Sequence, residues 1–555
     1  MKQKYNLLNY KKTYKTFSFK KEEKRFWNNQ NKINLVSKIL DENIEGKNRN
    51  KVALYWEGKD GKTKEITFFE LSILTNQFGN LLKDLKVKKG DRVFFFLPRI
   101  PEIYFGFLGA LKIGAVAGTL FPAFGKQALF DRLKNSSAKV LVTNRDLYKR
   151  VQKIEGKLPE LKKVVLVENL TKKLAHFPIA LKNKPMEYND PAFMLYTSAT
   201  GNTPVCGIVI PHKGFIQQHY TAKWVLDLKE DDIYWCTADP GWVTGVVYGL
   251  LAPLSLGISQ IVFEGRFSPQ KWYELIEKYR ISVLYTAPTA LRMLEKEGKK
   301  AKDYDLNSLR HINSVGEALT STSIKWVKRI FKVPIYDTWW QTETGAMILA
   351  NYPCLKLKEG SLGKPVPGIK VSIRNDKGKK LPPKKVGNLT IKPKWPSMMI
   401  DVWKNKKRYR SYFKHGWFFS GDKASYDKDG YFFFAGREDA IIKSSGERIA
   451  SFDVESSINE HKDVLEVGVI GKPDELRGEI IKAFIVLRPK IKPSKELKEE
   501  IKQHVKKDLA GHAYPKEIEF VKDLPKNRSG KIVRRILKAK ELGLPLGDTS
   551  TLIKS

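Results

Sequence analysis

The chain of 555 residues is poor in cysteine and has no long apolar segment. Its three cysteines, Cys206, Cys236 and Cys354, show none of the paired spacings that zinc sites or disulfide frameworks require. No apolar run approaches the roughly 20 residues needed to cross a bilayer. The Lys-rich stretch 1–25 lacks the continuous apolar core of a secretory signal. We therefore expect a cytoplasmic protein with no membrane partner and with cysteines that serve as small packing residues.

Motifs of several other enzyme classes are also missing. The sequence contains no Gly-x-Ser-x-Gly elbow and no His-Glu-x-x-His pair, which argues against α/β-hydrolases and zinc proteases. It contains no Gly-Lys-Ser/Thr at Walker spacing, and no internal repeat. The stretch 427–430 superficially resembles the start of a calcium loop, but the downstream acidic ligands are absent, so a hairpin turn explains it better.

Acidic residues are scarce, with 60 Asp and Glu against 101 Lys and Arg, which gives a formal net charge of +41. Such a charge raises the possibility of a nucleic-acid partner. The lysines, however, are spread through every segment and mixed with glutamates, as in 20–24 and 495–507. We interpret them as a solvated surface that attracts anionic substrates, and we expect no specific nucleic-acid partner.

The composition that remains is typical of a folded protein, with 42% hydrophobic and 29% charged residues. From residue 51 onward, short apolar runs alternate with longer amphipathic ones, which predicts an α/β fold of layered sheets and helices. Thr67 and Glu70 form a capping box that opens a helix toward Leu85. We predict strands at 92–97, 140–143, 164–167 and 193–196, and helices at 101–115, 267–280 and 321–331.

The pattern changes near Arg437, and we place a domain boundary there. A strand, turn and strand over 417–434 give way to a Gly/Ser stretch at 443–446. Strands at 464–470 and 481–487 and a helix begun by Ser494 suffice for a small α+β domain. We predict a large domain over 1–436, including an extension over 1–60, and a small domain over 437–555.

The stretch Asp-Thr-Trp-Trp-Gln-Thr-Glu-Thr-Gly at 337–345 is too polar for a core strand and too aromatic for a linker. Loops of this kind usually carry sites. Other blocks stand in a fixed order around it: Ala-Asp-Pro-Gly-Trp-Val-Thr-Gly at 238–245, Ser-Val-Gly-Glu-Ala at 314–318, Ser-Gly-Asp at 420–422, Gly-Arg-Glu-Asp at 436–439, Ser-Ser-Gly-Glu-Arg at 444–448, and Leu-Pro-Lys-Asn-Arg-Ser-Gly-Lys at 524–531.

Together these blocks resemble the acetyl-coenzyme A synthetases, a branch of the adenylate-forming enzymes, over nearly the whole chain. The resemblance implies a large α/β body with a small mobile α+β C-terminal domain. It implies an ATP-dependent acetate:CoA ligase that forms acetyl-adenylate, with Mg²⁺ as cofactor and acetate, ATP and coenzyme A as substrates. Two alternatives stay open: a ligase for another short acid such as propionate, and an adenylate-binding protein with impaired turnover.

The chemistry requires cations because a carboxylate must attack the α-phosphate of ATP. Two like charges about 4 Å apart repel by roughly 4 kcal/mol at an effective dielectric constant near 20. By resemblance Lys531 is the mobile lysine that bridges the two anions, and Arg437 and Arg448 lie near the nucleotide. The Pro-x-x-x-x-Gly-Lys context of Lys531 resembles a lysine acetylation site, and acetylation would remove this charge.

The resemblance assigns the remaining roles residue by residue. Asp422 would bind the ribose hydroxyls, although without the resemblance a turn cap after a strand would be the better interpretation. Glu343 would hold Mg²⁺. A second cation position at Asn459, His461 and Val464 is matched more weakly. The other nucleotide positions are Gly316, Glu317, Ala318, Asp337, Thr338, Trp339, Trp340, Gln341 and Thr342. The acyl pocket would comprise Val243, Thr244, Val315 and Trp340, whose indole leaves room for a short acid. Coenzyme A would contact Arg132, Thr244, Ser445 and Gly446, and Asp439 would be the hinge.

The phosphate loop departs from the family pattern. The family reads Tyr-Thr-Ser-Gly-Thr-Thr-Gly-x-Pro-Lys-Gly, whereas 196–207 here reads Tyr-Thr-Ser-Ala-Thr-Gly-Asn-Thr-Pro-Val-Cys-Gly, with no lysine. Thr197, Ser198 and Thr200 remain as donors to phosphate. We therefore expect weakened ATP affinity or slow adenylation.

Overall fold

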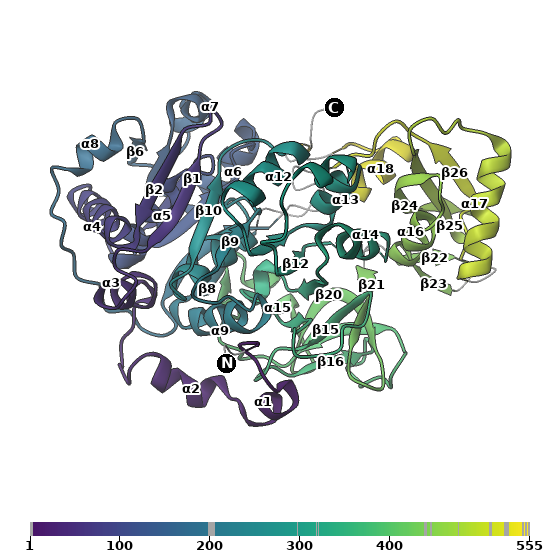
Figure 1. Ribbon diagram of the computed structural model, residues 1–555, viewed down its shortest axis with the longest axis horizontal. Coiled ribbons are helices and arrows are strands. Elements are labelled where there is room, and N and C mark those ends of the chain that lie inside the picture. Colours follow the sequence, from purple (N-terminus) through teal and green to yellow (C-terminus); the bar gives the residue numbers. More distant parts are fainter. Residues whose placement is uncertain are drawn as a thin grey trace.

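The computed structural model describes residues 4–197, 206–296, 298–317, 319, 321–437, 441–444, 447–475, 477–509, 513–526, 532–546, 549 and 552. Three β-sheets with helices on their faces form the molecule (Figure 1). The α/β class predicted from the sequence is confirmed. In the described part of the chain, every helix is too short or too polar to cross a membrane.

A seven-stranded sheet forms one end of the body. Its spatial order is β18, β8, β7, β4, β3, β5, β6, and the pairs among β3 to β7 are parallel. The strands are β3 (Arg92–Phe96), β4 (Val116–Leu120), β5 (Val140–Thr143), β6 (Lys163–Leu166), β7 (Pro191–Tyr196), β8 (Gly207–Pro211) and β18 (Asp401–Val402).

Alternation along β3 explains why helices cover both faces of this sheet. Phe95 packs into one hydrophobic cluster, whereas Phe94 and Phe96 pack into another. Successive side chains of a strand point to opposite faces, so an all-apolar strand requires cover on both sides. The sheet is therefore an interior layer.

A 14-stranded sheet runs through the centre of the molecule. Its path is β16, β17, β20, β21, β15, β14, β13, β12, β11, β9, β10, β1, β2, with β19 paired to β20. The strands are β1 (Val52–Glu57), β2 (Thr63–Thr67), β9 (Ile233–Cys236), β10 (Ser259–Phe263), β11 (Val283–Thr286), β12 (His311–Val315), β13 (Ile335–Trp339), β14 (Leu349–Ala350), β15 (Ser361–Pro365), β16 (Val371–Arg374), β17 (Gly387–Ile391), β19 (Phe413–Lys414), β20 (Trp417–Tyr426) and β21 (Phe432–Arg437).

Within this sheet β9 to β13 are parallel, so their carboxyl ends share one edge. Beyond β13 the pairing becomes antiparallel. In β20 and β21, Asp422 pairs in register with Arg437. The sheet thus brings segments far apart in sequence to one edge.

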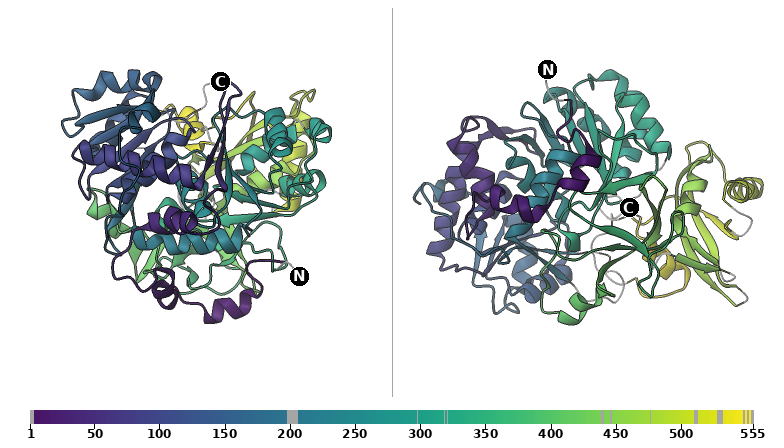
Figure 2. Two further views of the ribbon diagram at one scale, coloured as in Figure 1. Left: turned by 60° about the vertical axis from the view of Figure 1, so that its left-hand side comes forward. Right: turned by 90° about the horizontal axis from the view of Figure 1, so that it is seen from below.

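A five-stranded sheet with its own hydrophobic clusters forms the opposite end of the molecule (Figures 1 and 2). Along β25, Ala483 and Ile485 pack in one cluster and Phe484 and Val486 in the other. The strands are β22 (Ile441–Ser444), β23 (Glu447–Ala450), β24 (Val464–Asp474), β25 (Gly478–Leu487) and β26 (Glu517–Phe520). A small C-terminal unit follows from this packing, while the boundary at 436/437 stays a prediction.

The helices cover the faces of the three sheets. Those of the body are α1 (Tyr10–Thr16), α2 (Phe19–Phe26), α3 (Glu42–Glu45), α4 (Phe68–Asp84), α5 (Pro101–Lys112), α6 (Lys126–Ser136), α7 (Arg145–Glu155), α8 (Leu170–Leu174), α9 (Phe215–Val225), α10 (Val243–Val246), α11 (Ala252–Leu254), α12 (Pro269–Lys278), α13 (Pro288–Lys296), α14 (Ser321–Phe331) and α15 (Lys406–Ser411). The C-terminal unit contains α16 (Ser451–Asn459), α17 (Lys495–Asp508) and α18 (Arg534–Glu541). Short π-helical and 3₁₀ segments are η1 (Ser37–Asp41), η3 (Val247–Leu251), η2 (His212–Gly214), η4 (Gly298–Asp303) and η5 (Thr342–Thr344).

The helices and strands predicted from the sequence are confirmed, and their boundaries differ by a few residues. Both hydrogen bonds of the predicted capping box at Thr67 and Glu70 are present, and Ser494 caps α17. The turn at 427–430 joins β20 to β21, and Lys358 lies 2.6 Å from Asp429 in an ion pair. A hairpin turn, and not a calcium loop, therefore occupies this stretch.

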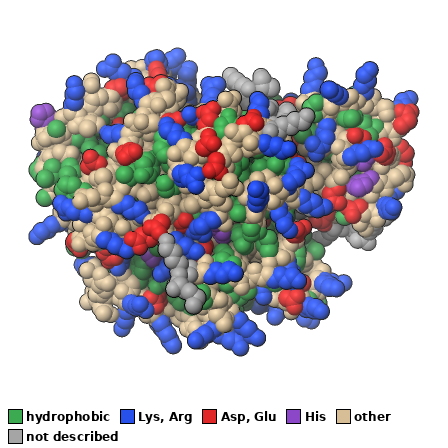
Figure 3. All heavy atoms as spheres, in the orientation of Figure 1, with side chains coloured by type: hydrophobic (Ala, Val, Ile, Leu, Met, Phe, Trp, Pro, Cys, Tyr) green, Lys and Arg blue, Asp and Glu red, His purple; other side chains and the backbone are tan. Residues whose placement is uncertain are grey.

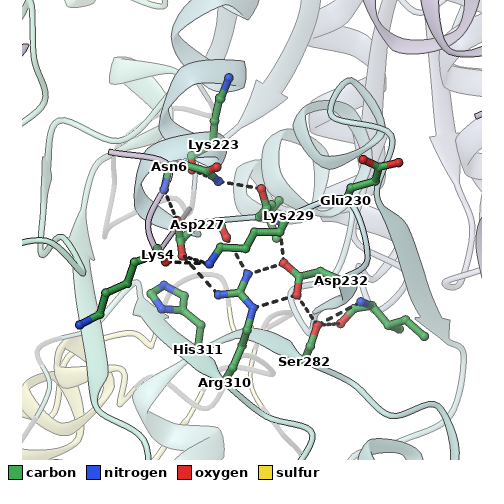
Figure 4. Close-up of polar contacts among 12 residues, drawn as sticks. Lys4, Asn6, Lys223, Asp227, Lys229, Glu230, Asp232, Ser282, Arg310 and His311 are labelled. Atoms are coloured by element: carbon green, nitrogen blue, oxygen red, sulfur yellow. Dashed lines mark hydrogen bonds and ion pairs between the residues drawn. The ribbon is translucent and has the colours of Figure 1, made fainter. Parts of the chain in front are cut away.

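The N-terminal segment is fastened to the body by polar contacts (Figure 4). The Asn6 backbone N–H donates to Asp227 Oδ1 at 2.7 Å, and the Asn6 side chain donates to the Leu228 carbonyl at 2.8 Å. Arg310 holds the other oxygen of Asp227 at 3.3 Å and also pairs with Asp232. Asp227 and Asp232 are buried, and Arg310, together with Lys229 at 3.5 Å from Asp227, supplies the positive charge that balances them.

Lysine and arginine side chains are distributed over the whole face seen in Figure 3, with acidic groups between them. This face shows no single basic stripe. The distribution agrees with the interpretation of the +41 charge as a solvated surface.

Candidate active site

A cleft of about 220 Å³ lies between the carboxyl edge of the 14-stranded sheet and the C-terminal unit. Ten of the sequence-predicted site residues line it: Gly316, Glu317, Asp337, Thr338, Trp339, Trp340, Gln341, Asp422, Arg437 and Asn459. Because β12 and β13 are parallel neighbours, the segments that follow them meet at this edge. Ligand sites in open α/β sheets lie at such carboxyl ends.

Asp337 is buried at the floor of the cleft. Ser314 Oγ donates to its Oδ1 at 2.6 Å, and the Thr338 backbone N–H donates to the same oxygen at 3.0 Å. Burial raises the pKa of Asp337 to about 7, and these two donors lower the pKa only in part. The carboxyl group therefore changes charge near neutral pH.

Asp422 joins the two halves of the site across 83 residues of sequence. Trp339 Nε1 donates to Asp422 Oδ2 at 2.8 Å, and Gln341 Nε2 donates to the same oxygen at 3.2 Å. Both donors belong to the 337–345 stretch, and Asp422 lies on β20. The buried carboxylate is thus held in one orientation with an edge toward the cleft.

Trp340 forms an aromatic wall with two tyrosines that the sequence analysis did not identify. Its indole Nε1 donates to Tyr285 OH at 3.2 Å, and its ring meets that of Tyr248 edge-on at 5.1 Å. Tyr248 lies on η3, directly after α10, which begins with Val243 and Thr244. Val243 and Thr244 therefore lie one helical turn before a tyrosine whose ring contacts Trp340.

Two family models match the chain. The model for the AMP-binding enzyme matches residues 40–399, and that for the AMP-binding enzyme C-terminal domain matches residues 453–531. The acetyl-coenzyme A synthetase of Bacillus subtilis (strain 168) is 50% identical over 563 residues, covering 99% of this chain and 98% of that protein. The chain belongs to the acetyl-coenzyme A synthetases of the AMP-binding enzyme family.

Further similar proteins cover more than 90% of this chain. The acetyl-coenzyme A synthetase of Methanothrix thermoacetophila is 40% identical and covers 94% of this chain and 85% of its own length. The crystal structure of an acyl-CoA synthetase from Brucella canis superposes with a TM-score of 0.75 at 32% identity, covering 97% of this chain and 99% of that chain. An anthranilate CoA ligase in complex with anthranoyl-AMP gives a TM-score of 0.85 at 30% identity, covering 93% and 98%.

In this synthetase, Glu343 lies beside the cleft on η5. Its Oε1 accepts a hydrogen bond from Tyr412 OH at 2.9 Å, and its backbone carbonyl accepts one from the Met399 N–H at 3.1 Å. The sequence analysis missed Tyr412. Within the described ranges, no three His, Cys, Asp or Glu side chains come together as a metal site.

Ion pairs between basic side chains and glutamates complete the walls of the cleft. On the body side Arg292 holds Glu317 at 2.7 Å, and Glu317 also accepts from Thr289. On the C-terminal side Arg534 pairs with Glu455, and Lys526 lies 2.5 Å from Glu466. Sequence reasoning missed these partners because no local pattern marks an ion pair between distant elements.

Several predicted residues lie away from the cleft. Arg132 is buried on α6, where its guanidinium lies 4.0 Å from the Phe124 ring. His461 is buried, and its Nε2 lies 3.3 Å from Glu500. Val464 is buried at the start of β24. Their roles in coenzyme A and cation binding stay predictions.

Other predicted positions fall outside the described residues: Ser198, Thr200, Ala318, Asp439, Ser445, Gly446 and Lys531, together with the side chain of Arg448. Thr197 is described, and its backbone N–H approaches the Cys206 carbonyl at 3.4 Å. The two ends of the phosphate loop therefore lie side by side.

Proposed function

We propose that the protein is an ATP-dependent acetate:CoA ligase that forms acetyl-CoA, AMP and pyrophosphate through acetyl-adenylate. The observation that carries the proposal is the position of Trp340. Its indole closes an aromatic wall directly beside the Trp339–Asp422 hydrogen bond, so a short acyl group and a nucleotide fit next to each other. The 50% identity to a full-length acetyl-coenzyme A synthetase supports acetate as the acid.

In the first half-reaction an acetate oxygen attacks the α-phosphorus, the bond to the bridging oxygen breaks, and pyrophosphate leaves. Asp422 would accept hydrogen bonds from the ribose hydroxyls because Trp339 and Gln341 already orient its carboxylate. Lys531 would neutralise the repulsion between acetate and phosphate. Arg437, on the rim of the cleft, would add positive charge near the nucleotide.

The residues at Glu343 fit a Mg²⁺ ion. Mg²⁺ commonly uses one or two carboxylates and completes its shell with water and substrate phosphates. Tyr412 donates to Oε1 of Glu343, and no hydrogen bond among the described residues involves Oε2, so this oxygen would be open to the ion. Bound there, Mg²⁺ would neutralise charge on the triphosphate.

In the second half-reaction the coenzyme A thiol attacks the acetyl carbonyl, and AMP leaves with the bonding electrons. A reorientation of the C-terminal unit about Asp439 would present Ser445 and Gly446 to coenzyme A, with Arg132 and Thr244 on the body. Before such a change the C-terminal unit would shield the adenylate from water, and after it the thiol could reach the adenylate. The proposed compartment of the reaction is the cytoplasm.

Measuring AMP formation tests the proposal. AMP should appear only when acetate, ATP and coenzyme A are all present. Lys531→Ala should abolish acetate-dependent pyrophosphate exchange but still convert added acetyl-adenylate and coenzyme A to acetyl-CoA. An absence of AMP with every short acid, combined with tight AMP binding, would leave only an adenylate-binding protein.

A further inference from the structure

The phosphate loop contains no cation of its own. Residues 197–207 include neither lysine nor arginine, although the triphosphate of ATP carries several negative charges. Backbone N–H groups and hydroxyls can hold phosphate oxygens, but they leave this charge unbalanced. Beyond the charge that Mg²⁺ would neutralise, a positive side chain for the β- and γ-phosphates would therefore have to come from another segment.

The strand that leaves the loop is paired with a segment rich in cations. Val402 on β18 pairs with Ile208 on β8, and the Trp403 backbone N–H donates to the Gly207 carbonyl at 2.8 Å. The chain then turns into α15, whose N-cap Asn405 accepts a hydrogen bond from the Arg408 N–H at 2.9 Å. Arg408 therefore lies in the first turn of α15, five residues after Trp403.

Arg408 is connected to Glu343 through Tyr412. Its guanidinium carbon lies 4.9 Å from the Tyr412 ring centroid, and the Tyr412 hydroxyl donates to Glu343 at 2.9 Å. The Tyr412 ring stacks on Phe418 at 5.4 Å with an angle of 5° between their planes. Burial raises the pKa of the thiol of Cys206, the residue before β8. The charges of Arg408 and Glu343 are close enough to act on the same pKa. The loop exit, Arg408 and Glu343 therefore form one neighbourhood.

The guanidinium of Arg408 is exposed, and among the residues that the structure describes no carboxylate pairs with it. Three other cations near the site are paired with carboxylates. Arg292 is bound to Glu317 and Arg534 to Glu455, while Lys406, on the same helix as Arg408, pairs with Asp401 at 3.1 Å. Arg408 thus retains donors for an anion.

We propose that Arg408 binds the β- and γ-phosphates of ATP and supplies the positive charge that the phosphate loop lacks. The proposal rests on the function proposed above and names a further substrate-binding residue for it. Tyr412 would orient Arg408 and Glu343 together, so that the guanidinium and the carboxylate that would hold Mg²⁺ approach the phosphates from one side. A planar guanidinium can bind two phosphate oxygens at once.

Comparing ATP with AMP separates this role from a general effect on the cleft. Arg408→Gln should raise the dissociation constant of Mg-ATP by about tenfold to a hundredfold, the range for a lost hydrogen bond to a charged group. Affinity for AMP should be unchanged, because AMP lacks the β- and γ-phosphates. Isothermal titration with each nucleotide measures both values on the full chain.

The neighbouring residue Arg410 provides the matched control. It is an exposed arginine on the same helix, so Arg410→Gln removes the same charge two residues away. This variant should bind ATP and AMP like the unmodified protein. An equal loss of ATP affinity in both variants would show a general field effect and overturn the proposal.

Two further variants test the charge itself. Arg408→Lys should retain part of the ATP affinity, and adding Val205→Lys to Arg408→Gln should restore it, because a lysine would then stand in the loop. Pyrophosphate exchange in the unmodified protein establishes the proposed function separately. If exchange is normal and Arg408→Gln binds ATP normally, the inference about Arg408 is wrong while the ligase remains.

Discussion

At the scale of single residues, two side chains of the 337–345 stretch have different physical tasks. Asp337 keeps a carboxyl group in a buried place where burial raises its pKa to about 7. Trp340 fills space, and its one polar atom is engaged by Tyr285. We therefore expect the first residue to make the site sensitive to pH, and we propose that the second sets the size of the acid.

The raised pKa of Asp337 predicts how stability depends on pH. The native state holds this proton up to about pH 7, whereas the unfolded chain releases it near the ordinary value of 3.8. The native state therefore binds more protons in this window, and its contribution to stability is lost as pH rises through about 7. Each pH unit in the window costs about 1.4 kcal/mol.

Asp337→Asn should remove this dependence because asparagine stays neutral while it still accepts from Ser314. Urea unfolding of both proteins from pH 4 to pH 8 measures the difference, which should grow up to about pH 7 and then level off. A difference that is constant across this range would contradict the assignment of the proton to Asp337.

Replacing Trp340 by glycine should lengthen the acids that the enzyme accepts. One methylene in an apolar pocket is worth about 1 to 3 kcal/mol, so kcat/KM for five- and six-carbon acids relative to acetate should rise more than tenfold. The KM for ATP should stay within a few-fold, since Trp339 and Asp422 are untouched. An unchanged chain-length profile in steady-state kinetics would place the acyl pocket elsewhere.

At the scale of elements, the local sequence predicts those helix ends that depend on contacts between residues a few positions apart. The capping box at Thr67 and the cap at Ser494 each depend on residues three positions apart, and both helices form where expected. The pairing of Trp339 with Asp422 spans 83 residues and depends on the path of the 14-stranded sheet. No local pattern contains that path, so Arg292, Tyr412, Glu455 and similar partners became visible only in the structure.

The buried ion pairs of Arg310, next to the attachment of the N-terminal segment, provide a test at this scale. Arg310→Met should lower the unfolding free energy by about 3 to 5 kcal/mol, because it takes the guanidinium away from two buried carboxylates. Lys229 would still lie 3.5 Å from Asp227, but Asp232 would lose its ion pair with Arg310. Arg280 forms an exposed pair with Asp305, whose side chains are 63% and 43% accessible, so Arg280→Met should cost less than about 1 kcal/mol. Equal losses in urea unfolding would refute a role for burial.

At the scale of the whole molecule, the charge of +41 acts as a diffuse field. The protein should bind duplex DNA weakly and without regard to sequence. Such binding should largely disappear between about 50 and 200 mM salt, as counterion release requires. Fluorescence anisotropy with two unrelated duplexes checks this, and a preference for one of them that persists at high salt would revive the nucleic-acid hypothesis.

The register between β20 and β21 links the nucleotide to the architecture. Asp422 lies directly opposite Arg437, the last residue of the strand that precedes the C-terminal sheet. A ribose bound by Asp422 would therefore lie beside the strand end from which the chain continues into the C-terminal unit. Binding and release of the ribose would act on this strand end, so a small displacement of β21 there would become a larger displacement at the distant α17.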